Sequence, residues 1–478
     1  MKKVYLDQKT KKGTIWISIG YLGSIIGFYP GFMSPDSFNQ YFQAITGNFN
    51  DHHPVIMAVL WGEYQKWISG PFLMLMFQTS LYWLSIFILY LKANKYGKSS
   101  WILIIAFAPF LISILGVVWK DIQFATGALL LVAISFDRMK FQRKLASFII
   151  FVSEFLLLMY ISNVRANSWA VVPFVTYIWL NSYIPSLAKF KTAILAFLIT
   201  VCCFIFGQYF SYSIVEAKRT NITNDYVVDS LFYFSVKERV SLIPGVQYED
   251  IVKCSYQDIA GMKLNGRFFC LNMTGKYDTS TMDPSVLNGK LAKKVISDPI
   301  GFAKMKISAF SEFEGNFWEK NYYYWQDGIE ENDLGISQTD NFFTLGIKNI
   351  SDLTATILPF VFAPIFWLWL STLMVSLAWL RRKFRFGNIS LCLALSGFLY
   401  NFQNILAAGG PDFRYFYWSA ISTCLAFVIS CLDKSMSVFN DIKFASIKWK
   451  LFWILITFIG LFHSHLFRIV SYESLLNG

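Results

Sequence analysis

Side chains that could carry chemistry are concentrated in a few short stretches that lie between apolar segments. The first is MSPDSFNQYFQ, residues 33–43, which follows an apolar segment and contains Asp36. Ser34 can cap a helix, Pro35 suits the first helical position, and an acid in the first turn is favoured by the helix dipole. Because the short amphipathic helix predicted after them would hold Asp36 over a cavity between apolar segments, we predict a catalytic carboxylate. An ordinary helix start is the alternative interpretation.

The second stretch is DHHPV, residues 51–55, which holds another acid and two of the four histidines. We predict that Asp51, His52 and His53 contact a substrate or support the residues that do. The alternative is that they are polar loop residues that cap the helix starting at Pro54. No further ligands at metal-site spacing are visible. No cofactor is therefore expected, and a divalent metal is compatible with the sequence but not indicated by it.

Three further hairpins between apolar segments each carry one basic residue, in the motifs VVWKDIQF, ISNVRANSW and GGPDFRYFYW. The candidate site residues in these motifs are Lys120, Asp121, Arg165, Asn167, Asp412, Arg414 and Tyr415. Arginine binds phosphate with a bidentate fork, so three bases on one side of the chain predict an anion site. The alternatives are local ion pairs, Lys120 with Asp121 or Arg414 with Asp412, and a Lys120 that extends its amine to the membrane interface.

The elements that must position these residues are predicted from composition. The chain is 55% hydrophobic and only 15% charged, which excludes a soluble domain of this size and favours an integral membrane protein. A membrane-spanning helix needs about 20 apolar residues. Eleven windows meet or approach this length: 13–29, 71–91, 101–118, 122–136, 146–162, 168–183, 191–210, 354–380, 388–408, 414–432 and 450–467. We predict an all-α polytopic membrane protein with about eleven transmembrane helices.

The net charge of +12 follows topology and does not indicate a nucleic-acid surface. Of the 42 basic residues, 22 lie in six short stretches: 2–12, 92–98, 137–144, 184–191, 381–387 and 433–450. These stretches alternate with segments that are poor in Lys and Arg, as expected for cytoplasmic loops. The N-terminus is therefore predicted to be cytoplasmic. Residues 30–70, the long segment 211–353 and the C-terminus are predicted to be external.

Three regions follow from this topology. We predict an N-terminal transmembrane module at 1–210 with a catalytic loop at 30–70, an external domain at 211–353, and a C-terminal transmembrane module at 354–478. Strand-like and helix-like text alternate in 211–353, which predicts a small mixed α/β or irregular domain. The aromatic residues of 318–325 are interpreted as an interfacial belt, with stacking on sugar rings as the alternative.

Two features leave alternatives open. Cys254 and Cys270 lie in the external segment, where they could form a disulfide in an oxidising compartment or remain unpaired. Glu154 lies within the apolar stretch FVSEFLLLMY, where an acid usually faces the bundle interior. It could be protonated, pair with another segment, or serve a proton-coupled carrier.

These motifs resemble the GT-C class of membrane glycosyltransferases. GFYPGFMSPDSFNQYFQA with DHHP is similar to the first external loop of that class, in which an acid precedes a membrane-parallel helix, and Asp36 is the matching position. Asp51 could match a second acid of that loop. WKD, RAN and DFRYFYW resemble the charged hairpins of bacterial polyprenyl-phosphate-sugar-dependent transferases, including the serotype-converting, often phage-encoded O-antigen glucosyltransferases.

The resemblance implies an inverting transferase that moves a sugar, with glucose expected, from undecaprenyl phosphate to a lipid-linked glycan such as the O-antigen of lipopolysaccharide. Asp36 would be the general base, and Lys120, Arg165 and Arg414 would hold the phosphate. The implied location is the bacterial inner membrane with a periplasmic active site. The expected partners are the donor, the acceptor and membrane lipid, without nucleic acid. An O-antigen polymerase and a lipid-linked glycan flippase or transporter are the alternatives.

Overall fold

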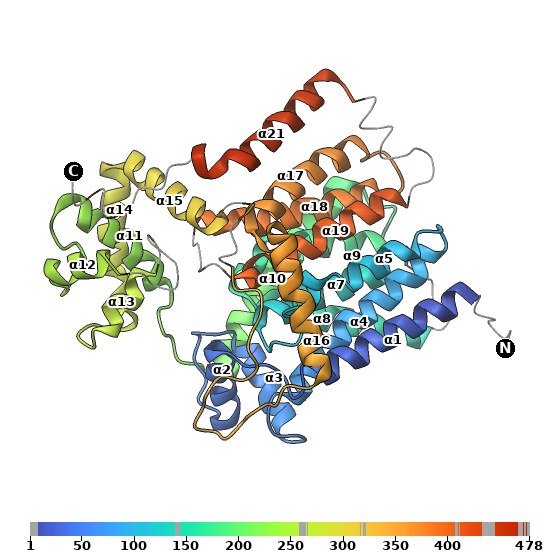
Figure 1. Cartoon of the computed structure of the whole chain (residues 1–478), viewed down its shortest axis with the longest axis horizontal. Helices are drawn as coiled ribbons and strands as arrows, with labels where there is room; N and C mark the ends of the chain where they lie inside the picture. The colour runs from blue at the N-terminus through green and yellow to red at the C-terminus, as the bar shows by residue number, and fades with distance from the viewer. Residues whose placement is uncertain are drawn as a thin grey trace.

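The computed structural model of the chain describes residues 8–138, 144–257, 264, 266–315, 317–318, 322–406, 410, 412–432, 445–466, 472 and 475. Throughout these residues the secondary structure is helical, and extended segments meet only at isolated bridges. The predicted all-α class is therefore confirmed. Figure 1 shows a large helical bundle with a smaller group of helices at one end.

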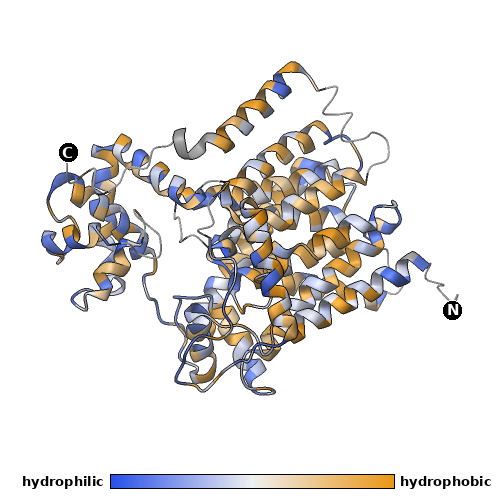
Figure 2. Cartoon of the chain, viewed as in Figure 1, coloured by the Kyte–Doolittle hydropathy of each residue, from blue (hydrophilic) through white to orange (hydrophobic). Residues whose placement is uncertain are grey.

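The bundle is built around α7 (Lys120–Ser135), most of whose side chains are buried. Helix α7 packs against α4, α8, α9 and α19. The helices of the bundle are α1 (Gln8–Gly27), α4 (Phe72–Asn94), α5 (Ser99–Ala106), α6 (Pro109–Ile112), α7, α8 (Lys144–Asn163), α9 (Val172–Tyr183), α10 (Lys189–Tyr209), α16 (Phe342–Ile357), α17 (Pro364–Leu380), α18 (Gly387–Phe402), α19 (Tyr417–Cys431) and α21 (Ile447–Leu466). Apolar residues dominate them (Figure 2), and buried apolar side chains from different helices pack against one another in one continuous core.

Three helices in the described part of the chain are long and apolar enough to cross a membrane: Phe72–Asn94, Lys144–Asn163 and Lys189–Ile214. The prediction of about eleven such spans is therefore wrong for these residues. The reason is that an apolar window need not form one uninterrupted helix. The window 101–118 is broken at Pro109 into α5 and α6, because proline cannot continue a helix from the preceding turn. Helix α7 has 16 residues, a length of about 24 Å against a hydrocarbon core of about 30 Å.

The smaller group consists of α11 (Thr223–Glu238), α12 (Tyr248–Ser255), α13 (Arg267–Met273), α14 (Pro284–Ser297) and α15 (Pro299–Glu314). Its own apolar core includes Val228, Phe232 and Leu271. The predicted mixed α/β domain is wrong, because no strand forms among its described residues. The strand-like text 265–289 instead contains α13, a 3₁₀ turn and the start of α14, since strand propensity depends on neighbours that are absent here.

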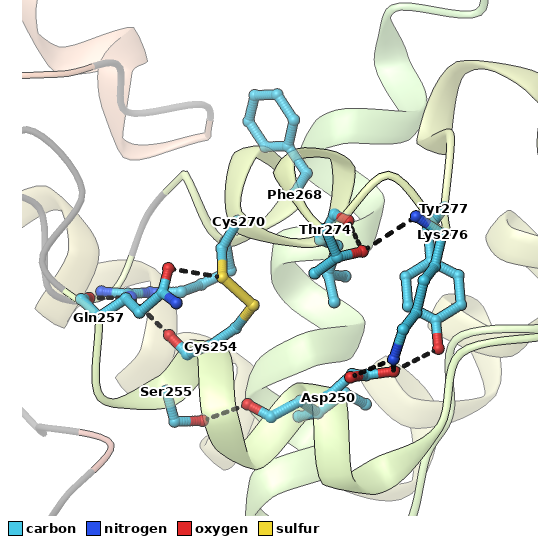
Figure 3. The surroundings of a disulfide bond; sticks show 12 residues. Asp250, Cys254, Ser255, Gln257, Phe268, Cys270, Thr274, Lys276 and Tyr277 are labelled. Carbon is cyan, nitrogen blue, oxygen red and sulfur yellow. Dashed lines mark hydrogen bonds and ion pairs between the residues drawn. A yellow bond between two sulfur atoms is a disulfide. The ribbon is translucent and has the colours of Figure 1, made fainter.

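A disulfide joins Cys254 at the end of α12 to Cys270 in α13, with 5.8 Å between the Cα atoms (Figure 3). The alternative of two unpaired cysteines is thereby excluded for this structure. Near the disulfide, the Asp250 carboxylate accepts hydrogen bonds from Lys276 and from the Tyr277 hydroxyl at 2.6 Å. The bridge fixes α12 to α13, and the polar cluster fixes it to the segment that follows α13.

Charged residues gather at both ends of α7. Beyond its last turn, Asp137 forms ion pairs with Lys95 and Arg385, so three of the six basic stretches meet at one end of the bundle. At the other end, Lys120 begins the helix next to α2 (Pro35–Thr46) and α3 (Val55–Gln65). The candidate site residues lie at this second end.

Candidate active site

The start of α2 is attached to the start of α7. The Ser37 hydroxyl accepts a hydrogen bond from the Ser34 backbone N–H at 3.2 Å and donates to the Val118 carbonyl at 2.9 Å. The Trp119 indole N–H donates to the Ser34 hydroxyl at 2.7 Å. Pro35 occupies the first turn, as the sequence predicted. These contacts determine where Asp36, in the same turn, can point.

The Asp36 carboxylate points into a cluster of basic side chains. Its Oδ2 accepts a hydrogen bond from Arg414 Nη1 at 2.9 Å, and its Oδ1 lies 4.0 Å from His53 Nε2. The other ring nitrogen of His53, Nδ1, lies 2.9 Å from Lys120 Nζ. The Asp36 side chain retains 37% of its exposed area, against 13% for Arg414 and 6% for His53. The carboxylate is thus the accessible member of a largely buried chain of polar contacts.

Arg414 is held in place from several directions by its own hairpin. Its Nε lies 2.8 Å from Asp412 Oδ2, and its Nη2 donates to the Tyr415 hydroxyl at 3.2 Å. The guanidinium carbon lies 4.6 Å from the centre of the Trp119 ring, a cation–π distance. The local ion pair of Asp412 with Arg414 therefore exists, and it coexists with the contact between Arg414 and Asp36.

Arg165 is positioned by two buried partners. It forms an ion pair with Asp121, whose side chain is fully buried, and its Nε donates to Asn167 Oδ1 at 2.6 Å. Asp121 is thus the partner of Arg165 and not of its neighbour Lys120. The guanidinium carbon of Arg165 lies 5.5 Å from the Tyr415 ring centre, and that of Arg414 lies 5.0 Å from the same ring. Tyr415 therefore brings the two arginines together.

Burial and charge act in opposite directions on Asp36. Burial raises the pKa of this carboxyl, but the positive charges of Arg414 and Lys120 outweigh burial and hold the pKa well below its usual range. The carboxyl is therefore ionised at neutral pH. Burial lowers the pKa of Lys120 to about 8, although Asp36 opposes this shift.

His53 is neutral, because burial and then the charge of Lys120 lower its pKa. When Lys120 is protonated it donates to Nδ1, which leaves the imidazole proton on Nε2, the nitrogen that faces Asp36. The charge of Lys120 thus reaches Asp36 through an oriented imidazole.

Asp51 and His52 lie apart from this cluster. The Asp51 carboxylate accepts hydrogen bonds from the Tyr212 hydroxyl at 2.7 Å and from the Thr220 backbone N–H at 2.6 Å. It fastens the loop before α3 to the segment that follows α10. His52 is exposed, with its ring centre 4.8 Å from that of His53.

Two aromatic residues complete the site: Trp119, which was not singled out from the sequence, and Tyr323, which was interpreted there as part of the interfacial belt. Trp119 contacts both Ser34 and Arg414, and its place directly before Lys120 in VVWKDIQF is the signal that could have identified it. The ring of Tyr323 lies 6.4 Å from that of Trp119, and its carbonyl accepts from the Phe413 N–H at 3.0 Å. The aromatic cluster is mixed in character: Trp318 is exposed, as in an interfacial belt, whereas Trp325 is buried.

Glu154 lies elsewhere. Both of its carboxylate oxygens accept hydrogen bonds from Arg138 at 3.0 Å, and the residue is buried, with only 2% exposure. The Trp179 indole at 2.8 Å and the Tyr183 hydroxyl at 2.9 Å also donate to it. The acid is a paired group that ties α8 to α9, which matches the pairing alternative.

Among the residues that the structure describes, no group of three or more His, Cys, Asp and Glu side chains is arranged to hold a metal ion. Comparison with known proteins finds no matching family model, no matching curated protein and no matching solved structure. The function is therefore argued from the site itself, an ionised and accessible carboxylate that contacts one arginine directly and one lysine through a histidine.

Proposed function

We propose that the protein is an inverting membrane glycosyltransferase of the GT-C type. It transfers a sugar, with glucose expected, from undecaprenyl phosphate to a hydroxyl of a lipid-linked glycan such as O-antigen. The observation that carries this proposal is the contact of Asp36 with Arg414 at 2.9 Å, beside His53 and Lys120. A carboxylate base next to cations is the arrangement that sugar transfer from a lipid phosphate requires.

Asp36 acts as the general base. It removes the proton of the acceptor hydroxyl while that oxygen attacks the anomeric carbon of the donor. The bond between this carbon and the phosphate oxygen breaks, and its electron pair stays on the phosphate. The products are a glycoside of inverted configuration and free polyprenyl phosphate. The ionised state of Asp36 at neutral pH supports this role, because only the carboxylate can accept the proton.

Arg414 connects donor binding to the strength of the base. Before the donor binds, its guanidinium pairs with Asp36 and lowers the proton affinity of the carboxylate. A donor phosphate competes for the same guanidinium, and the loss of that pairing makes Asp36 a stronger base. Donor binding therefore precedes activation of the acceptor. Arg165, which shares the Tyr415 ring with Arg414, adds a second guanidinium for the phosphate.

The proposed location is the bacterial inner membrane, with a cytoplasmic N-terminus and the site on the periplasmic side. Two observations support this orientation. Lys95 and Arg385 meet at Asp137, at the end of the bundle opposite Lys120, and basic loops favour the cytoplasm. The disulfide between Cys254 and Cys270 is favoured in an oxidising compartment.

The test is Asp36→Asn in the purified protein, reconstituted with polyprenyl-phosphate glucose and a lipid-linked glycan. We expect the rate constant for transfer to fall by about 10² to 10⁴, because general-base assistance is lost. The matched control is Asp333→Asn, which changes an exposed acid of the external loop. Mass spectrometry of the product should show a gain of one hexose per repeat. Full activity of Asp36→Asn would refute the proposed base.

The same mass measurement separates the alternatives. A polymerase would add whole repeat units to the glycan, and a flippase would leave every glycan mass unchanged. Either product pattern would refute the proposed single-sugar transfer.

A further inference from the structure

A polar cavity lies beside the site. It has a volume of about 260 Å³ and is lined by Trp325, Asp327, Ile329, Gln338, Asp340 and Lys348, together with Gly328. None of these residues takes part in the cluster around Asp36. The cavity has room for several water molecules, at roughly 30 Å³ each, or for one small hydroxylated ring.

One segment, residues 322–330, borders both the site and the cavity. On the site side, Tyr323 packs near Trp119, and its hydroxyl donates to Gln326 at 2.6 Å. On the cavity side lie Trp325 and Asp327. A ligand in the cavity and a ligand at Asp36 would therefore contact the same short segment.

The cavity is also attached to the start of α2. The Met33 N–H donates to the Gly328 carbonyl at 3.1 Å, and the Glu330 N–H donates to the Met33 carbonyl at 3.2 Å. Met33 precedes Asp36 by three residues, so their Cα atoms lie within about 11 Å of each other. The cavity wall and the turn that carries Asp36 are therefore joined through Met33.

Ring packing, a hydrogen bond and one glycine position the residues of the cavity wall. Trp325 packs against Phe28 and Phe32, with ring centres 5.9 and 5.8 Å away, and its indole N–H donates to Asp327 at 3.1 Å. Gly328 has a φ of +68°, and a Cβ there would lie 2.1 Å from Gln338 Oε1. Glycine thus allows the backbone angle and leaves the Gln338 amide in place.

The lining chemistry selects among ligands. Asp327 and Asp340 are acceptors, Lys348 is a donor, and the Gln338 amide is both. Two carboxylates against one ammonium give the lining an excess of negative charge, which disfavours a phosphate. Asp327 is already paired with Lys348 at 2.5 Å, which weakens the case for a metal cation. Mixed donors and acceptors beside an indole fit a neutral sugar with several hydroxyls.

We propose that this cavity binds a sugar of the acceptor glycan and so presents the neighbouring acceptor hydroxyl to Asp36. This inference rests on the proposed glycosyltransferase activity. It assigns the anionic donor to the cluster of Lys120, Arg165 and Arg414, and the neutral acceptor to the cavity.

The test uses the full chain in nanodiscs and saturation-transfer difference NMR. The probes are methyl glycosides of glucose, galactose, rhamnose and N-acetylglucosamine, with calcium chloride as a separate addition. We expect signals from at least one glycoside with the unmodified protein, and their loss in the double variant Gln338→Ala/Asp340→Ala. The control Asp333→Asn alters an exposed acid of the same loop outside the cavity and should keep the signals.

Kinetics give the second readout. In Asp340→Ala the KM for the lipid-linked acceptor should rise by about tenfold, the effect of one lost hydrogen bond. The KM for the donor and the rate at saturating acceptor should stay within twofold. Absence of glycoside signals, equal signals in the double variant, or binding of calcium without any glycoside would each overturn the inference.

The variant Asp36→Asn separates this inference from the proposed function. It should lose transfer but keep the glycoside signals, because its side chain is not part of the cavity. If Asp36→Asn kept full transfer activity while the double variant lost the signals, the proposed base would be refuted and the glycan-binding cavity supported.

Discussion

Lys120 is the group of the site whose charge changes in an accessible pH range. Burial lowers its pKa to about 8, with Asp36 opposing and Arg165 and Arg414 adding to the shift. The ammonium therefore predominates below this pH and is lost as the pH rises through it. Since the charge is proposed to hold the donor phosphate, we expect the KM for the donor to be constant below pH 8. Above pH 8 it should rise by up to about tenfold per unit.

The measurement is the donor KM between pH 6 and pH 10 for the unmodified protein and for Lys120→Arg. An arginine stays charged throughout this range, so the rise above pH 8 should disappear in the variant. If the same rise persisted in Lys120→Arg, its origin would lie in another group.

The ion pair of Arg165 with Asp121 contributes to stability, because both side chains are buried, at 7% and 0% exposure. Removing the charge of one partner leaves the other without compensation in the interior. We expect Asp121→Asn to lower the free energy of unfolding by about 3–5 kcal/mol, measured by SDS titration in mixed micelles.

The double variant Arg165→Met/Asp121→Leu tests this explanation, since apolar replacements remove the uncompensated charge as well as the pair. It should recover much of the lost stability while transfer activity stays low. A double variant less stable than Asp121→Asn would show that the effect comes from packing and not from charge.

At the scale of elements, the disulfide joins α12 to α13 within the group of helices from α11 to α15. Its two cysteines are 16 residues apart, and closing a loop of this size stabilises the folded state by about 3 kcal/mol. Cys254→Ser/Cys270→Ser should therefore expose this group to proteolysis about two orders of magnitude faster in the full chain. Proteolysis followed by mass spectrometry identifies the cleaved segment.

The matched control is Cys202→Ser, which removes an exposed cysteine without a disulfide. Its cleavage rate should equal that of the unmodified protein, and a reductant should accelerate cleavage of the unmodified protein to the rate of the double variant. Equal rates in all three proteins would mean that the apolar core of this group is sufficient without the bridge.

For the whole molecule, the sequence singled out several residues that the structure brings together, but it did not reveal the architecture around them. Asp36, Arg414 and Lys120 could be singled out because charge between apolar segments is costly and therefore informative. The contacts of Asp51 with Tyr212 and Thr220 could not be foreseen, because they join residues more than 160 positions apart. Within the described residues, the predicted number of spans is too high because hydropathy does not reveal where a helix is interrupted, as at Pro109.

The orientation of the whole molecule in the membrane can be tested by labelling. The proposed topology puts the loop that contains Asp333 outside and the first turn of α10, which contains Lys191, on the cytoplasmic side, and both residues are exposed. Asp333→Cys and Lys191→Cys would be made in a background in which only Cys254 and Cys270 remain. A membrane-impermeant maleimide should label Asp333→Cys in intact cells and Lys191→Cys only after the membrane is opened. The segment before Asp333 hydrogen-bonds Met33, which lies next to the site, so Asp333 and Asp36 are on the same side of the membrane. Labelling of Lys191→Cys alone in intact cells would therefore put Asp36 in the cytoplasm and refute a periplasmic active site.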